Sequence, residues 1–281
     1  MSDFIYAVLH HSFMFNALLT GVLASVACGV VGTYVVSRRI TYIAGGIAHS
    51  VLGGLGFARY LATVYDWSWL SPLHGAIVAA LLASMVIGWV SLKAREREDT
   101  VIGAIWAIGM AIGVIFISMT PGYNVDLMTY LFGNILLVTG HDLMLIAILD
   151  GVIVLTVALF YNKFLAVCFD EEFARIRGIN TEFFYLLLLG LTGLTVVILV
   201  DVVGIVMVIA LLTLPAAIAG HFTRTLWQTM WVATVLSILF TTFGLAISYS
   251  PDLPAGATII IFAGIVYLGV ALGKRVLRPH H

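Results

Sequence analysis

Charged residues are scarce in this chain. Asp, Glu, Lys and Arg make up 10% of its 281 residues, whereas a soluble domain contains about 25%. Hydrophobic residues make up 62% and recur in continuous runs to the last residues, which excludes a soluble domain of any size. The runs do not alternate with polar residues, so a β-barrel is excluded as well. The composition therefore predicts an all-α, polytopic membrane protein in which residues 1–281 form a single transmembrane domain.

Motifs for catalysis and for cofactor binding are also missing. The two cysteines, Cys28 and Cys168, are too few for a disulfide framework or a cysteine-based metal site. The chain has no G-x-x-x-x-G-K-[ST] sequence, so it cannot bind ATP by that route, and it has no protease or hydrolase motif. A net charge of −1 without a basic stripe gives no reason to expect a nucleic-acid partner. We expect a chain that is not an enzyme and binds no cofactor of its own.

The apolar runs are each long enough to cross a hydrocarbon core of about 30 Å. The sequence predicts nine spans. Two of the runs have almost no connector between them, around Asp201, so 183–220 could be one crossing and a broken or re-entrant piece, which gives eight spans as the alternative. The nine runs are 14–36, 42–63, 73–92, 101–119, 143–160, 183–200, 203–220, 227–248 and 256–273.

The positively charged residues orient these spans. Of the 13 Lys and Arg residues, only Arg59 falls on one side of the predicted spans, and all the others fall on the opposite side. By the positive-inside rule the side rich in Lys and Arg is cytoplasmic. The other side carries interfacial aromatic residues such as Tyr65, Trp67 and Trp69. This arrangement predicts an N-terminus on the outside, with membrane lipid around the spans.

Three ionisable residues, His49, Asp150 and Asp201, fall within or at the end of apolar runs. Each is costly there unless it faces a cavity or a partner. His49 has Gly45 four residues before it and Gly53 four after, so a helix would carry a single imidazole on a bare face. Such a face is typical of a transport pathway, and an imidazole with carboxylates suits zinc, manganese or ferrous iron. The alternative is that each residue simply bonds a neighbouring helix.

One cytoplasmic segment, residues 169–180, has the signals of a short, independently capped helix at about 170–178. Asp170 suits the N-cap, and Glu171 and Glu172 occupy the first turn. Arg175 lies in the last turn, and Gly178 ends the helix. Its apolar Phe173 and Ile176 could insert into a groove on another protein. A helix lying on the membrane surface is the alternative.

Taken together, seven segments resemble the permease subunit of the zinc, manganese and iron family of ATP-binding-cassette (ABC) importers. They occur in the expected order and span nearly the whole chain. The first three contain Asn16-Ala-Leu-Leu, the stretch from Val35 to Ser50 with Ser-Arg-Arg-Ile and Ala-His-Ser, and Glu98-Asp-Thr-Val-Ile-Gly. The other four are Leu131-Phe-Gly-Asn-Ile-Leu, Phe169-Asp-Glu-Glu-Phe-Ala-Arg, the stretch from Val203 to Ala217, and Asp252-Leu-Pro-Ala-Gly-Ala-Thr.

The resemblance implies an assembly in a prokaryotic cell membrane. Two copies form a pore above a dimer of cytoplasmic ATPase subunits, which bind the ATP, and an external solute-binding protein delivers the metal. The capped segment corresponds to the coupling helix of the family, and we expect Phe173 and Ala174 at its docking surface. The residues implied in coupling are Asp170, Glu171, Glu172, Phe173, Ala174, Arg175 and Gly178.

One position departs from the family pattern. The family commonly has an aspartate four residues before the histidine, and this chain has Gly45 there. His49 carries over as the metal ligand, with Asp201 as the first choice for a substitute carboxylate and Asp150 as the second. A site with few carboxylates favours zinc over manganese. A chelated cargo is an alternative, as are a proton-coupled secondary transporter that uses His49 and Asp150 and, more distantly, a membrane scaffold.

Overall fold

All the regular secondary structure in the part of the chain that the computed structural model describes is helical, which confirms the predicted all-α class. The structure describes residues 2–67, 69–93, 98–121, 133, 135, 138–205, 208–251 and 253–277. Part of the family-like segment at 131–136, and Asp252, lie outside these residues. The helices are α1 (Ser2–His10), α2 (Ser12–Ser37), α3 (Thr41–Val64), α4 (Pro72–Lys93), α5 (Glu98–Met119), α7 (Gly140–Phe169), α8 (Glu171–Ile176), α9 (Thr181–Val203), α10 (Val208–Gly220), α11 (Leu226–Tyr249) and α12 (Ala255–Leu277).

Seven helices of the described chain are long and apolar enough to cross a membrane, namely α2, α4, α5, α7, α9, α11 and α12. Helix α3 has 24 residues but is not among them, because its glycines, His49 and Arg59 make it less apolar. The region predicted as two spans, 183–200 and 203–220, forms the long α9 and a second helix, α10, of only 13 residues. At 1.5 Å per residue α10 is about 20 Å long, which is short for a full crossing. The count of eight or nine spans stays a prediction.

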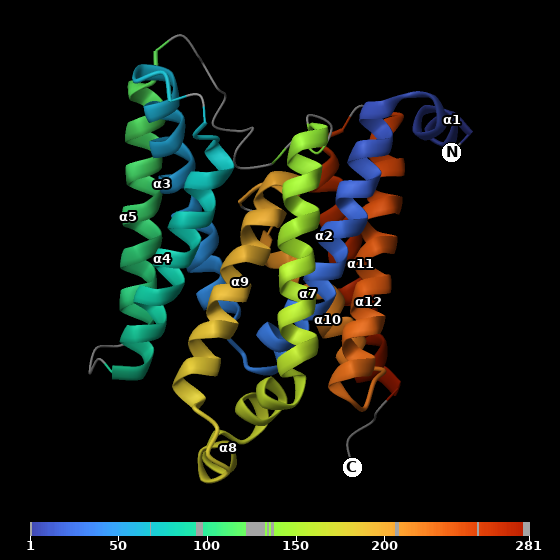
Figure 1. Ribbon diagram of the computed structural model, residues 1–281. Helices are drawn as coiled ribbons and strands as arrows, with labels where there is room; N and C mark the ends of the chain where they lie inside the picture. The colour runs from blue at the N-terminus through green and yellow to red at the C-terminus, as the bar shows by residue number, and fades with distance from the viewer. Residues whose placement is uncertain are drawn as a thin grey trace.

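The helices form two groups joined by α9. Helices α3, α4 and α5 stand together on one side, and α2, α10, α11 and α12 stand on the other, with α7 and α9 between them (Figure 1). Helix α2 lies inside its group, where it packs on α7, α9, α10 and α11. Its buried face consists largely of alanine, glycine, serine and threonine, small residues that allow close approach of neighbouring helices.

Glycines set the distance between α3 and α5. A Cβ atom on Gly53 would lie 2.9 Å from the carbonyl oxygen of Gly109, and one on Gly56 would lie 2.7 Å from that of Gly113. Real Cβ atoms do not come this close to backbone atoms. The two helices therefore meet backbone to backbone, as small residues permit in membrane proteins.

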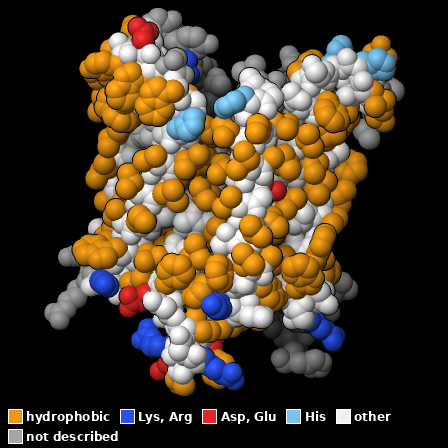
Figure 2. All heavy atoms as spheres, viewed as in Figure 1, with side chains coloured by type: hydrophobic (Ala, Val, Ile, Leu, Met, Phe, Trp, Pro, Cys, Tyr) orange, Lys and Arg blue, Asp and Glu red, His pale blue; other side chains and the backbone are white. Residues whose placement is uncertain are grey.

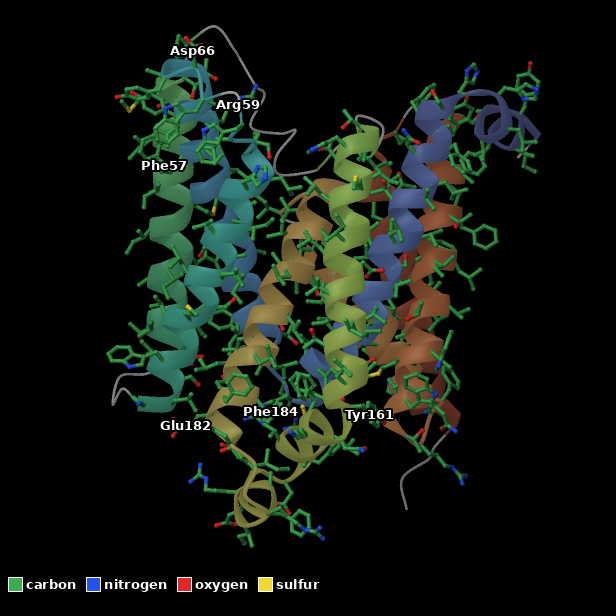
Figure 3. The ribbon with its side chains drawn as sticks, in the orientation of Figure 1. Phe57, Arg59, Asp66, Tyr161, Glu182 and Phe184 are labelled. Carbon is green, nitrogen blue, oxygen red and sulfur yellow. The ribbon has the colours of Figure 1, made fainter. Side chains whose placement is uncertain are left out.

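The two ends of the bundle differ in charge. Lys and Arg side chains gather around the end that carries α8 (Figure 2). The N-terminus and α1 lie at the opposite end (Figure 1), where Arg59 and Asp66 are also found (Figure 3). Trp67 and Trp69 stack there with ring centroids 5.9 Å apart. A low content of basic residues thus marks the end far from α8.

Candidate functional site

His49 lies on α3, and its side chain is buried, with 8% of the residue exposed. Its Nδ1 atom is 2.9 Å from the carbonyl oxygen of Gly45, one turn earlier on the same helix. A carbonyl oxygen can only accept, so Nδ1 donates the hydrogen bond and Nε2 keeps the lone pair. Histidines that bind metals are commonly oriented in this way, with the second ring nitrogen bonded to a backbone carbonyl.

Trp106 of α5 covers one face of the His49 ring. The ring centroids are 3.9 Å apart and the planes differ by 21°, which is a stacked arrangement. Tyr42, near the start of α3, lies on the same indole with centroids 6.4 Å apart. Trp106 thus restrains the imidazole plane in addition to the hydrogen bond from Nδ1. This residue was not predicted as part of the site, because nothing in the sequence distinguishes it from the other five tryptophans.

The position of the missing family aspartate faces neighbouring apolar side chains. A Cβ atom on Gly45 would lie 2.8 Å from Cδ1 of Ile209 on α10 and 3.8 Å from Cζ3 of Trp106. Only the far end of Ile209 would have to move, so the space is tight without being closed by backbone. The glycine therefore belongs to a packed contact of α3 with α5 and α10.

Asp150 is buried on α7, with 6% of the residue exposed, and its Oδ1 atom has no hydrogen-bond partner among the described residues. Helix α7 packs on α2 and α9, whereas His49 lies on α3, which packs on α4, α5 and α9. Asp150 and His49 therefore belong to different helix contacts. In the described part of the chain, no three His, Cys, Asp or Glu residues are grouped closely enough to hold a metal ion.

Asp201 lies in the last turn of α9, before Gly204, whose φ of +79° lets the chain leave the helix. The side chain of Asp201 lies outside the described residues. Its helix packs on both α3 and α10. The expectation that Asp201 supplies the missing carboxylate stays a prediction.

The predicted capped segment forms helix α8, which hangs at the end of the bundle (Figure 1). The Asp170 side chain accepts a hydrogen bond of 2.8 Å from the backbone N–H of Phe173, as an N-cap does. Within α8, Oε1 of Glu171 lies 3.6 Å from Nη2 of Arg175, which is one turn further along the helix. Gly178, with φ +77°, donates its N–H to the carbonyl of Arg175 and closes the helix. The caps are those predicted, and the helix itself is shorter, Glu171–Ile176.

The apolar side chains of α8 divide into two sets. Phe173 is 48% exposed and Ile176 is 83% exposed, so both remain available to a partner. Ala174 is fully buried, and its carbonyl accepts the N–H of Ile179. The expectation that Ala174 lies at a docking surface is therefore corrected. It faces the body of its own chain, because a helix of six residues must bury one face to stay attached.

Arg38 is a second residue that the sequence analysis missed. Its Nη2 atom lies 2.9 Å from Oε2 of Glu171, its Nη1 donates to the carbonyl of Val167, and its guanidinium lies 4.8 Å from the centre of the Tyr185 ring. The neighbouring Arg39 is exposed. Two adjacent arginines give no signal in the sequence as to which of them is partly buried and paired.

Known proteins resemble this chain in sequence and in fold. The model of the ABC 3 transport family matches residues 10–274. The chain is 43% identical to a Chlamydia muridarum protein named "Probable metal transport system membrane protein", over 93% of this chain and 89% of that protein. It is 31% identical to the manganese transport system membrane protein MntC of Listeria monocytogenes, over 94% and 91%. The solved structure of PsaBC from Streptococcus pneumoniae in complex with Fab superimposes with a TM-score of 0.85 at 29% identity, over 96% of this chain and 94% of that one.

Proposed function

Since the chain belongs to the ABC 3 transport family, we propose that it is the permease subunit of an ATP-driven importer that carries divalent transition metal into a bacterial cell. The chain is a multi-pass bacterial membrane protein whose relatives are metal-transport permeases. In the proposed assembly two copies line the pore, an ATPase dimer sits below α8, and an external solute-binding protein delivers the metal. The gathering of Lys and Arg around α8 supports a cytoplasmic position for that end.

The orientation of His49 is the observation that carries this proposal. A histidine whose Nδ1 is bonded to a backbone carbonyl presents Nε2 as a ligand in its neutral form. It sits on α3, which is less apolar than the seven candidate spans of the described chain, and burying such a group without a task is costly. We assign His49 as the residue that receives the metal ion during transport.

We propose zinc as the preferred cargo. Position 45 carries no carboxylate, and the packed contact around Gly45 leaves imidazole as the ligand that α3 supplies. Imidazole suits zinc, whereas manganese prefers carboxylate and water oxygen. Manganese is the second candidate, because a relative at 31% identity is named as a manganese transport protein. Ferrous iron and a chelated metal remain further alternatives within the same function.

Asp201 is proposed as the carboxylate that complements His49, ahead of Asp150. Helix α9, which carries Asp201, packs on α3 and α10. Asp150 lies on α7 in the contact with α2 and α9. Asp201 is therefore favoured, because its helix, α9, packs on α3, the helix of His49.

Helix α8 is proposed as the contact with the ATPase. Its exposed Phe173 and Ile176 suit a groove on a partner, and its charged residues suit orientation within that groove. ATP hydrolysis is assigned to the partner. The residues proposed for coupling, besides these two, are Asp170, Glu171, Glu172, Arg175 and Gly178.

The proposal is tested by reconstituting the chain with its ATPase and its solute-binding protein in proteoliposomes and by measuring uptake of zinc and of manganese. His49→Ala should abolish uptake of both metals while the complex still assembles. His221→Ala, which changes an exposed histidine at the α8 end, should transport normally and serves as the matched control. Normal uptake by His49→Ala at limiting metal contradicts the assignment. Uptake driven by a proton gradient without ATP would favour the secondary transporter instead.

A further inference from the structure

We propose that Arg38 is a positioning residue that links helix α8 to the start of α3, and thereby links the ATPase contact to the helix of His49. The inference rests on the proposed function, because it assigns a route for the motion that the importer requires. It starts from the contacts of one guanidinium with three different elements.

The guanidinium of Arg38 holds the end of α7 and the start of α8 at the same time. Its Nη2 pairs with Glu171, the first residue of α8, at 2.9 Å. Its Nη1 donates to the carbonyl of Val167, in the last turn of α7. Carbonyls in a last helical turn have no partner within the helix, and a cation there also meets the negative end of the helix dipole. The side chain of Arg38 is 16% exposed and that of Glu171 is 38% exposed, so the ion pair is partly shielded from water.

The backbone of Arg38 is tied directly to α3. Arg38 is the C-cap of α2, and the chain reverses at Arg39 with a φ of +60°. Ile40 then donates its N–H to the carbonyl of Val35 at 3.0 Å, which tightens the turn, and α3 begins at Thr41. His49 is eight residues farther on, about 12 Å along the helix. This connection has no slack, so a displacement of Arg38 reaches the first turns of α3.

The Tyr185 ring lies on the other side of the guanidinium and is itself held by neighbouring helices. The Tyr185 ring on α9 lies 4.8 Å from the Arg38 carbon, and the Tyr185 hydroxyl is 3.1 Å from the Ser91 hydroxyl at the end of α4. Phe164 of α7 meets Phe184 of α9 at 5.8 Å between ring centroids, and Phe184 lies at the α8 end of α9 (Figure 3). The ends of α4, α7 and α9 thus form the support against which Arg38 is held.

Space beside this contact gives α8 room to move against the α2–α3 turn. A polar cleft of about 690 Å³ lies there, lined by residues that include Arg39, Tyr42, Asp99 and Cys168. A flat guanidinium satisfies Glu171 and the Val167 carbonyl together only while α7 and α8 keep their present relation. A movement of α8 driven by the ATPase must therefore carry Arg38 with it or break the contact.

The test measures metal uptake per ATP hydrolysed by the complete transporter in proteoliposomes, together with thermal unfolding of the purified complex. For Arg38→Gln we expect this ratio to fall by about tenfold or more, with assembly and ATP hydrolysis retained. Arg38→Lys should keep part of the coupling, because an ammonium keeps the charge but lacks the fork that reaches both acceptors. If Arg38→Gln fails to assemble, the ratio of metal uptake to ATP hydrolysis is measured in Arg38→Lys and in Glu171→Gln, and it should fall in both.

Arg39→Gln is the matched control, since it removes the adjacent exposed arginine, and its ratio should stay within about twofold of wild type. Glu171→Gln removes the anionic partner of Arg38 and leaves the bond to the Val167 carbonyl, so it should lower the same ratio, and the Arg38→Gln, Glu171→Gln double variant should lose no more than Arg38→Gln alone. Wild-type coupling in Arg38→Gln, an equal loss in Arg39→Gln, or additive losses in the double variant each overturns the link. If the wild-type complex moves no divalent metal, the proposed function fails first and the link fails with it.

Discussion

The imidazole of His49 lies parallel to the indole of Trp106, with 3.9 Å between ring centroids and 21° between planes. One residue comes from α3 and the other from α5, so the proposed metal ligand is oriented by a second helix as well as by its own.

The first prediction concerns Trp106. Trp106→Ala should reduce metal affinity and uptake by about tenfold, the range found for groups that orient a metal ligand, whereas Trp106→Phe should retain most of the activity. Addition of copper(II) or cobalt(II) should quench tryptophan fluorescence in wild type, and the quenching should be much smaller in Trp106→Phe and in His49→Ala. Trp89→Phe, at an exposed position on α4, is the control. Equal quenching in all variants would place the bound metal elsewhere.

The second prediction concerns the missing aspartate. Gly45→Asp should shift uptake from zinc toward manganese, because it adds a hard oxygen ligand one turn from His49. It should also destabilise the protein by about 1–3 kcal/mol, since Ile209 has to move. Adding Ile209→Val should recover part of the stability and leave the selectivity shift. Competition uptake and thermal unfolding measure the two effects, and an unchanged metal preference in the double variant would show that position 45 does not set selectivity.

The third prediction separates the two aspartates. Asp201→Asn should lower zinc uptake by about tenfold or more if its carboxylate completes the site. Asp150→Asn should leave uptake nearly unchanged, because Asp150 lies on a helix that packs on α2 and α9. The opposite ranking in the same assay would make Asp150 the ligand and would require α7 to approach α3 during transport.

The fourth prediction compares the two sets of side chains on α8. Phe173→Ala and Ile176→Ala should lower zinc-stimulated ATP hydrolysis and uptake while the isolated permease unfolds at the wild-type temperature, since both side chains are exposed. Ala174→Asp should instead destabilise the permease itself by about 2 kcal/mol or more, because it buries a charge inside the chain. Thermal unfolding without the ATPase distinguishes these cases. Normal stability of Ala174→Asp would mean that α8 detaches readily from the body.

Much of the fold could be predicted from the sequence because long apolar runs have few alternatives in a membrane. The capped helix was also predictable, since Asp170 and Gly178 signal its two ends by local chemistry. The length of α10 was not, because 203–220 is apolar throughout and composition does not reveal where a helix starts. That Gly204 ends α9 is seen only in the structure, where its φ is +79°.

The environment of the candidate site was harder to predict, because it depends on contacts between segments that are distant in the sequence. His49 is recognisable as an isolated imidazole in an apolar run, but its partner Trp106 lies 57 residues later in a run of ordinary membrane composition. The burial of Ala174 and the partial burial of Arg38 depend on how α8 folds back onto α7. Such contacts between distant segments are set by packing, and a single sequence carries no local sign of them.

The backbone contact between α3 and α5 limits where the pore is able to open. Gly53 and Gly56 meet the backbone at Gly109 and Gly113 with no side chains between them, so sliding one helix past the other would drive backbone atoms into each other. The two helices therefore travel as one rigid body, and Trp106 accompanies His49 through the whole transport cycle. In the proposed transport cycle we expect α3 and α5 to move against α9 and α10, which pack on α3, and the imidazole to keep its orientation whichever side of the membrane the site opens to.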